Sequence, residues 1–255
     1  MGGKVFGSGA GTPLLLVHGF PLDGRMWAPQ VEALGIGRRV LVPDLLGFGG
    51  TPLPEGLCGL ERQAEALAAF ATAHGAHRLV VCGLSMGGYI ALAFAERFPE
   101  RLAGLILADT RAGADPEPAR QARALNADRV LRAGVGFIAE DMLPKLFHPR
   151  RRDGKHAVAD EVRSIMLGQR PEGVAAALRA MGERPSRETV LENLECPVLI
   201  IVGEGDQVIP PEEARAMAAL NPRSRLLVIP DAGHLSNLEN PGAFNEGVAS
   251  FLASF

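Results

Sequence analysis

Residues 79–97 read LVVCGLSMGGYIALAFAER, an apolar run that meets a glycine-rich turn and then continues in a helical pattern. The first four residues form a short continuous apolar run, as expected of a strand covered on both faces. Beyond the turn, apolar residues recur at helical spacing, at Ile90, Ala91, Phe94 and Ala95. The stretch therefore predicts a strand, a sharp turn that carries Ser85, and a helix.

A turn this tight pushes its middle residue toward a backbone conformation that is disfavoured for any residue with a Cβ atom, so its neighbours must be small. Gly83, Gly87 and Gly88 meet that demand. The geometry lifts the Ser85 hydroxyl above the strand ends and leaves the unpaired N–H groups of the helix start beside it. Because such N–H groups can hold an oxyanion, Ser85 is a candidate nucleophile.

Composition and charge narrow the class of protein. The chain has 255 residues, of which 47% are hydrophobic and 22% charged, and its formal net charge is −3. This composition is typical of a soluble globule and favours neither nucleic acid nor a membrane as a partner. The uncharged run 79–95 is short for a membrane span and is interrupted by glycines and a serine. Since residues 1–11 lack the apolar core of a secretion signal, we expect a cytoplasmic protein.

Strand and helix patterns alternate along most of the chain. Before and after the serine stretch, the apolar pattern predicts strands at residues 4–6, 14–17, 39–42 and 102–107, and helices at 26–34 and 60–71. The alternation resumes with strands at 197–202 and 226–229, a helix at 212–220, and a final helix that Asn240 caps and Pro241 begins. The pattern predicts an α/β fold with a mostly parallel central sheet and helices on both faces.

The alternation stops between residues 111 and 190. This stretch is helical in pattern and rich in arginine, with breaks at several prolines. We interpret it as a helical cap inserted into a core made of residues 1–110 and 191–255.

A serine nucleophile needs a base, and the base needs an acid that orients it. In an open parallel sheet these groups are expected in the loops after the carboxyl ends of the strands. His234 follows the last predicted strand, and Asp206 follows the strand before it. Asp109 also follows a strand end and remains an alternative acid, whereas Asp44 and Asp231 are typical of turns.

The chain resembles the α/β-hydrolase family in five motifs that stand in the family's order: HGFPLDGRMW, PDLLGFGGT, GLSMGG, GEGDQVIP and AGHLSNLENP. The resemblance runs nearly from end to end and implies Ser85 as nucleophile, His234 as general base and acid, and Asp206 as the orienting acid. It also implies an oxyanion hole made of the backbone N–H groups of Phe20 and Met86. His18 is then structural and supports the Phe20 loop.

The cap is similar to the caps of small esterases and enol-lactonases. Its apolar residues Met142 and Phe147, together with Trp27, are candidates to line an acyl pocket, although apolar residues on helices belong to the core as often. A diacid lactone would need an arginine aimed inward. We expect Arg120, Arg123 and Arg129 to be solvated residues on helix faces instead.

The residues contain no known nucleotide or zinc motif, and Cys58, Cys82 and Cys196 are odd in number and unrelated in spacing. We therefore expect a serine hydrolase without cofactor or metal, acting on a small-molecule ester or lactone through an acyl-enzyme. The HGFP motif also resembles cofactor-free haloperoxidases, so perhydrolase activity is an alternative. A ligand sensor that keeps the triad but scarcely turns over is a second alternative. The sequence does not determine the oligomeric state.

Overall fold

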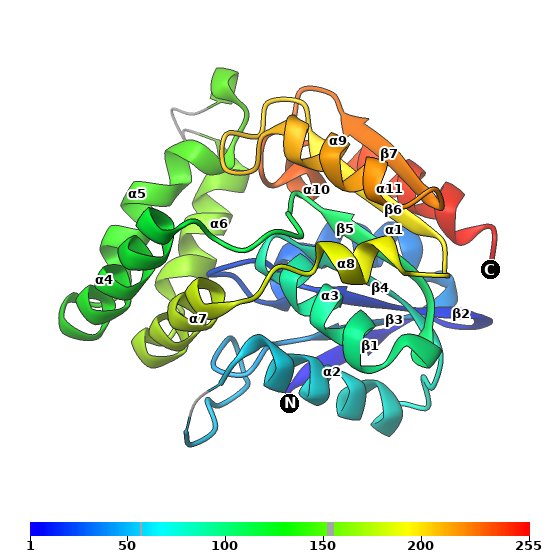
Figure 1. Ribbon diagram of the computed structural model, residues 1–255, viewed down its shortest axis with the longest axis horizontal. Helices are drawn as coiled ribbons and strands as arrows, with labels where there is room; N and C mark the ends of the chain where they lie inside the picture. Colours follow the sequence, from blue (N-terminus) through cyan, green and yellow to red (C-terminus); the bar gives the residue numbers. More distant parts are fainter. Residues whose placement is uncertain (57, 152–155) are drawn as a thin grey trace.

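A computed structural model describes residues 1–56, 58–151 and 156–255. Within these residues seven strands form one sheet in the order β1-β3-β2-β4-β5-β6-β7 (Figure 1). β1 runs antiparallel to β3, and every other neighbouring pair is parallel. The strands are β1 (Gly3–Phe6), β2 (Ser8–Val17), β3 (Ile36–Pro43), β4 (Leu79–Leu84), β5 (Leu102–Ala108), β6 (Val198–Gly203) and β7 (Ser224–Ile229). The predicted fold class is confirmed.

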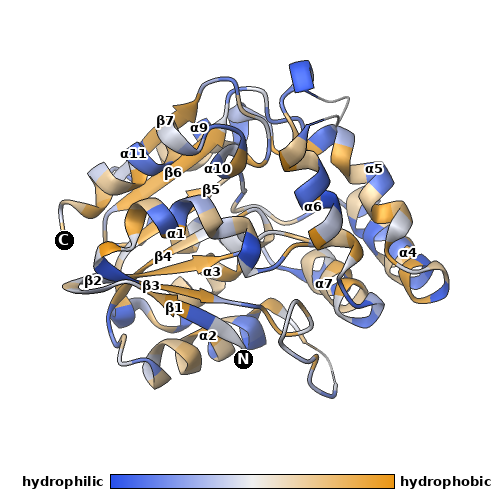
Figure 2. Ribbon diagram, turned by 180° about the vertical axis from the view of Figure 1, so that it is seen from behind, coloured by the Kyte–Doolittle hydropathy of each residue, from blue (hydrophilic) through white to orange (hydrophobic). Residues whose placement is uncertain are grey.

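Helices cover both faces of this sheet. On one face α1 (Ala28–Leu34) packs against α11 (Pro241–Leu252), and Figure 2 shows both helices in front of the strands. The opposite face carries α2 (Leu60–Ala73), α3 (Met86–Arg97) and α9 (Pro211–Leu220), which lie in front in Figure 1. Because both faces are covered, β4, β5 and β6 are buried at every position, which explains their continuous apolar sequences.

Three local features differ from the expectation. The helix predicted at 26–34 begins as a 3-10 helix, Gly24–Trp27, before α1 starts. β2 begins at Ser8 instead of Leu14, because its exposed glycine-rich half pairs with β3 through backbone atoms that leave no apolar pattern. The short helix α10 (Ser236–Glu239) was not expected. Asn240 does cap the last helix, since its side chain accepts a hydrogen bond from the Ala243 N–H.

Four helices make up most of the insertion: α4 (Glu117–Ala133), α5 (Gly136–Leu146), α6 (Ala157–Leu167) and α7 (Pro171–Glu183). Figure 1 shows them grouped beyond one edge of the sheet, where α4 packs along α7. A fifth helix, α8 (Glu188–Glu192), packs against α3 and α9 of the sheet region. Residues 152–155 of the predicted cap lie outside the described residues. The division into a core of 1–110 and 191–255 and a cap of 111–190 stays a prediction.

No helix in the described ranges is long and apolar enough to cross a membrane. The uncharged run 79–95 is divided between β4 and α3, and the turn at Ser85 separates the two. The apolar character of this run thus reflects burial at the centre of an α/β sheet.

Candidate active site

Ser85 lies on the sharp turn between β4 and α3, with a positive φ of 54°. Its N–H donates to the Ala108 carbonyl of β5, at 2.9 Å. The neighbouring glycines are needed because the backbone passes too close for a side chain. A Cβ on Gly83 would collide with the Gly87 carbonyl, and a Cβ on Gly87 would collide with the Val17 carbonyl of β2. The G-x-S-x-G spacing therefore follows from close packing around the turn.

Ser85, His234 and Asp206 form a continuous hydrogen-bonded chain. The distance from Ser85 Oγ to His234 Nε2 is 2.9 Å, and that from His234 Nδ1 to Asp206 Oδ2 is 2.8 Å. Both His234 and Asp206 are buried, whereas Ser85 is partly exposed. Three residues from the ends of β4, β6 and β7 thus meet at one edge of the sheet, as the strand order requires. The arrangement can move a proton from the serine to the imidazole.

The carboxylate of Asp206 is held from its other side as well. Its Oδ1 accepts hydrogen bonds from the backbone N–H groups of Val208 and Ile209, at 2.8 and 2.9 Å. These bonds leave Oδ2 facing the imidazole of His234. Burial lowers the pKa of His234, but the charge and hydrogen bond of Asp206 outweigh it, so the pKa lies above its ordinary value.

Asp109, the alternative acid, is fully buried at the end of β5 with a φ of 47°. Its Oδ1 accepts a hydrogen bond from the Gly203 N–H at 2.8 Å, and its Oδ2 accepts one from the Ser236 hydroxyl at 2.5 Å. Asp109 therefore bonds to Gly203 at the end of β6 and to Ser236 of α10, whereas the carboxylate that bonds to the imidazole of His234 belongs to Asp206. The pKa of Asp109 is raised to about 8, mainly by burial and secondly by the nearby charge of Asp206.

The loop after β2 runs directly beside the serine turn. A Cβ on Gly19 would lie 3.6 Å from the Cβ of Ser85. The N–H groups of Phe20 and Met86, the two predicted oxyanion donors, make no hydrogen bond in the part of the chain that the structure describes. They are free to receive an oxygen atom of a ligand.

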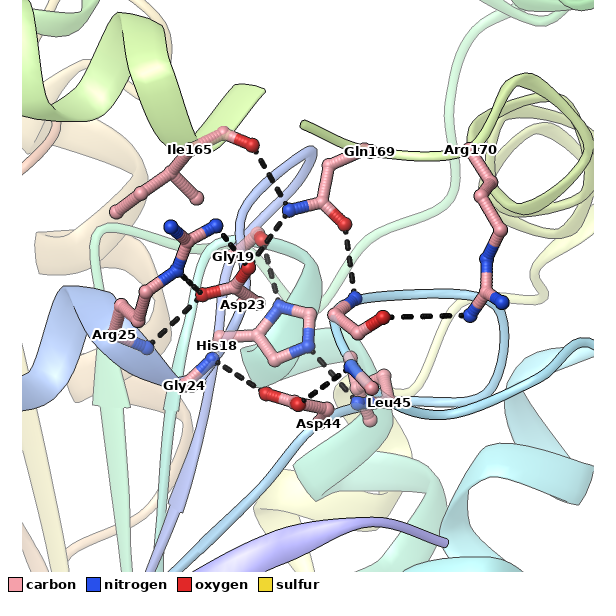
Figure 3. Close-up of polar contacts among 12 residues, drawn as sticks. His18, Gly19, Asp23, Gly24, Arg25, Asp44, Leu45, Ile165, Gln169 and Arg170 are labelled. Carbon is pink, nitrogen blue, oxygen red and sulfur yellow. Dashed lines mark hydrogen bonds and ion pairs between the residues drawn. The ribbon is translucent and has the colours of Figure 1, made fainter. Parts of the chain in front are cut away.

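His18 joins this loop to the loop after β3, as Figure 3 shows. Its Nδ1 lies 3.0 Å from the Gly19 carbonyl, and its Nε2 accepts a hydrogen bond from the Leu45 N–H at 3.0 Å. Since a backbone N–H can only donate, the proton of the ring lies on Nδ1. Burial lowers the pKa of His18, which favours this neutral form. The expected structural role of His18 agrees with these contacts.

Sequence reasoning missed Gln169, which links the insertion to the same loop (Figure 3). Its amide donates to Asp23 Oδ2 at 2.9 Å, and its carbonyl oxygen accepts from the Gly49 N–H at 3.0 Å. Asp23 is buried and also pairs with Arg25. We call this set, Gln169 with Asp23 and Gly49, the Gln169 junction. No motif marks a glutamine between two helices, so only its three-dimensional contacts reveal it.

A second missed residue is Glu239, on α10 beside the histidine loop. Its carboxylate accepts hydrogen bonds from the Gly233 N–H and from the His148 N–H of the insertion. The Leu235 N–H donates to the Leu146 carbonyl. Leu235 is therefore bonded directly to the last residue of α5, and Gly233 is linked through Glu239 to His148, two residues beyond that helix. Burial raises the pKa of Glu239. The motif AGHLSNLENP contains this residue but does not state its role.

The three predicted acyl-pocket residues occupy different surroundings. Trp27 is fully buried, and its ring packs 6.2 Å from that of Phe244 on α11. Phe147 is also fully buried and contacts the imidazole of His156, whereas Met142 is partly exposed. A role in substrate binding stays a prediction for all three.

Of the arginines expected on solvated helix faces, two are paired with acids of the insertion: Arg120 with Glu117 and Arg123 with Asp115. Arg129 lies over the ring of Phe137. In the described ranges, no three His, Cys, Asp or Glu side chains come together in a way that could hold a metal ion.

Comparisons with known proteins find relatives along nearly the whole chain. A solved structure of a thermophilic esterase from Thermogutta terrifontis, with malate bound, is 44% identical and has a TM-score of 0.95, covering 99% of this chain and 93% of that one. A Mycobacterium tuberculosis H37Rv protein, provisionally named as the non-heme bromoperoxidase BpoC, is 32% identical over 97% of this chain and 96% of its own. The 3-oxoadipate enol-lactonase 2 of Acinetobacter baylyi is 27% identical over 98% and 92%.

The family model described as "Alpha/beta hydrolase family" matches residues 14–246, which contain the end of β2, all of β3 to β7, the insertion and the first half of α11. The resemblance in the five motifs is thereby confirmed over most of the chain. The chain belongs to the alpha/beta hydrolase family.

Proposed function

We propose that this protein is a serine hydrolase that cleaves small to medium carboxylic esters or lactones through an acyl-enzyme, without a cofactor. The observation that carries the proposal is the hydrogen-bonded chain from Ser85 through His234 to Asp206. The esterase and enol-lactonase names among the relatives support the same class of substrate.

In the first half of the reaction, Ser85 Oγ attacks the ester carbonyl carbon while His234 Nε2 takes the serine proton. Asp206 keeps the imidazole in the tautomer that can accept this proton and stabilises the imidazolium that forms. The negative oxygen of the tetrahedral intermediate receives hydrogen bonds from the N–H groups of Phe20 and Met86. The alcohol then leaves with the proton from His234, and the acyl group stays on Ser85.

In the second half, a water molecule replaces the alcohol. His234 takes a proton from this water, which attacks the acyl carbon, and the same two N–H groups hold the new oxyanion. Collapse of the intermediate returns the proton to Ser85 Oγ and releases the acid. A lactone follows the same steps, except that its alcohol stays joined to the acid product.

The experiment that tests the proposal is the substitution Ser85→Ala. We expect it to abolish ester hydrolysis and labelling by a fluorophosphonate while the protein stays folded, since removing a triad member costs several orders of magnitude in rate. Ser186→Ala, at an exposed serine of the insertion, is the matched control and should keep both. Labelling that persists in the Ser85 variant would place the nucleophile elsewhere.

A second candidate is perhydrolase activity on the same triad, which the BpoC relative favours. Peroxide would then replace water as the attacking group on the acyl-enzyme. Bromination of an indicator in the presence of peroxide, bromide and a carboxylic acid separates this reaction from hydrolysis. Multiple turnovers of a simple aryl ester would reject the further alternative of a ligand sensor.

A further inference from the structure

We propose that Arg111 is a specificity residue that binds a carboxylate group of the substrate, so that the preferred esters or lactones are those of small molecules bearing a second, anionic carboxyl group. This inference rests on the proposed hydrolase function. It concerns an arginine that belongs to no sequence motif and lies next to the triad.

The position of Arg111 is fixed by its neighbours on both sides of the active site. Thr110, the preceding residue, is buried and donates from its hydroxyl to the Ser85 carbonyl at 2.8 Å. At the far end of the side chain, Arg111 Nη2 donates to the Val208 carbonyl at 3.4 Å. Val208 lies two residues after Asp206, in the turn that the Asp206 carboxylate holds. The guanidinium group therefore lies between the segments that carry the nucleophile and the acid.

The guanidinium group lacks the partners that a partly buried cation normally has. Its Nε is buried without a hydrogen-bond partner, and the long bond to Val208 is the interaction found for it among the described residues. Among the described residues, Arg184 is the other arginine with such a buried Nε, but Arg184 donates to the Asp115 carboxylate at 2.7 Å. Arg111 has no corresponding acid in the described part of the chain. Buried donors are normally satisfied, so the free positions point to a ligand.

The surroundings limit which ligand fits. An arginine presents parallel N–H donors that match the two oxygens of a carboxylate. The neighbouring Asp206 carboxylate would repel a doubly charged phosphate more than a singly charged carboxylate. Burial and, less strongly, the charge of Arg111 lower the pKa of His234, so the cation is within electrostatic reach of this imidazole. A single substrate molecule would then place its ester group at Ser85 and its carboxylate group against Arg111.

The test compares matched pairs of neutral and anionic esters. For a carboxylate on the acyl side, the pairs are the monomethyl esters of succinate, glutarate and adipate against methyl butanoate, pentanoate and hexanoate. For one on the alcohol side, the pair is 4-acetoxybenzoate against 4-acetylphenyl acetate. The proteins are wild type, Arg111→Gln, Arg111→Lys and the control Arg120→Gln, which removes the same charge from an exposed pair on α4.

We expect the wild type to prefer the anionic ester in one of the two arms. Arg111→Gln should lower kcat/KM for that ester by roughly 10- to 100-fold, mainly through KM, and change the neutral partner by less than about threefold. Arg111→Lys should recover part of the loss, because it keeps the charge but not the fork of donors. Arg120→Gln should behave as wild type.

An equal loss on neutral and anionic esters would overturn the inference and make Arg111 a support of the triad. No change on either ester, in a variant with unaltered thermal unfolding, would also overturn it. Calorimetric titration with glutarate separates the inference from the proposed function, since it needs no turnover. Millimolar binding to wild type that weakens in Arg111→Gln would uphold the carboxylate site even if no ester were cleaved. Absence of binding, together with no preference for anionic esters, would reject it.

Discussion

Two buried carboxyl groups follow β5 and β6, and their contacts separate their roles. Asp206 accepts the hydrogen bond from His234, whereas Asp109 holds the Gly203 N–H and the Ser236 hydroxyl. Because burial and the charge of Asp206 raise the pKa of Asp109 to about 8, Asp109 is mainly protonated at neutral pH. A neutral Asp109 serves as a hydrogen-bonding partner, and Asp206 supplies the charge beside the imidazole.

This difference predicts the effect of two matched substitutions. Asp206→Asn should lower kcat for an aryl ester by about 10³- to 10⁴-fold, since the amide no longer supports the charge and tautomer of His234. Asp109→Asn should lower it by less than about tenfold, because an amide keeps the size of the carboxyl group, its oxygen can accept from the Gly203 N–H, and its NH2 can donate to the Ser236 oxygen with the direction of that bond reversed. Steady-state kinetics on the two variants decides between them. The reverse order of effects would assign the acid to Asp109.

The pH profile of kcat/KM follows from the groups around His234, which are Ser85, Asp206, Asp109 and Arg111. Burial lowers the pKa of the imidazole, but the charge and hydrogen bond of Asp206, with a smaller contribution from Asp109, together raise it more, so the net pKa lies above about 6.5. Protonated His234 cannot accept the serine proton, so activity should fall as pH drops through that pKa. Arg111→Gln should move the midpoint to higher pH, because it removes a positive charge. A rate that stays constant between about pH 8 and about pH 5 would contradict histidine as the base.

At the scale of elements, the insertion is attached to both loops that build the candidate site. The Gln169 junction binds the loop that carries Phe20, and the end of α5 binds the loop that carries His234. A shift of these helices would therefore move the proposed oxyanion donor Phe20 and the proposed base His234 together. Neither attachment involves a residue that the five motifs single out as catalytic.

Substitution of Gln169 tests how strongly the insertion orders the site. Gln169→Leu should lower the free energy of unfolding by about 1 to 3 kcal/mol, because it leaves the Gly49 N–H and part of the buried Asp23 carboxylate without partners. We also expect a fall in kcat. Urea denaturation and ester kinetics give the two values. The control is Gln121→Leu, at an exposed position of α4, which should stay within about 0.5 kcal/mol. If both variants changed the free energy of unfolding and kcat equally, Gln169 would have no special role in ordering the site.

At the scale of the whole molecule, the chain returns from the insertion to the sheet through two buried arginines. Arg184 lies over the Tyr89 ring of α3 and pairs with Asp115, and Arg187 pairs with Glu61 of α2 and Glu96 of α3. The backbone N–H of Arg187 donates to the Ala112 carbonyl, so the two ends of the insertion meet. These contacts connect α2 and α3 with the first residues of the insertion.

Removing Arg184 should be costly because it leaves a buried carboxylate with fewer partners. We expect Arg184→Met to lower the free energy of unfolding by about 3 kcal/mol near neutral pH, the low end for a broken buried pair since Asp115 keeps Arg123. Arg179→Met, at a surface pair with Asp128, should cost at most about 1 kcal/mol. Denaturant unfolding of both variants measures these costs. Equal costs would show that burial of the pair does not matter.

The same variant has a pH signature with a defined sign. Burial would raise the pKa of Asp115, but Arg184 and Arg123 outweigh burial and hold the pKa below its ordinary value. The stabilisation by Asp115 is therefore present above the unfolded pKa of about 3.8 and is lost as pH falls through the folded pKa. The cost of Arg184→Met should shrink over that range, because a protonated Asp115 has less need of a cation.

The sequence by itself determined the fold and the candidate triad. Strands covered on both faces must be apolar throughout, and a strand that turns sharply into a helix needs glycine at fixed positions around Ser85. Both demands act on neighbouring residues, so they leave a readable pattern. Asp206 and His234 could be placed because carboxyl ends of parallel strands share one edge of the sheet. The choice of Asp206 over Asp109 came from the resemblance to a family.

Only the tertiary structure decided which polar side chains without a motif reach the site. Gln169, Glu239 and Arg111 each form a hydrogen bond with a residue 91 to 146 positions away in the chain, and ordinary loop or helix sequences surround them. For Trp27 and Phe147, too, the sequence did not predict the surroundings, since an apolar side chain gives the same sequence pattern whether it faces a ligand or the core. A contact between distant segments depends on how far each loop extends and how the insertion packs. No local pattern of residues encodes how far a loop extends or how the insertion packs. The sequence therefore shows that these residues are present but not which residues they contact.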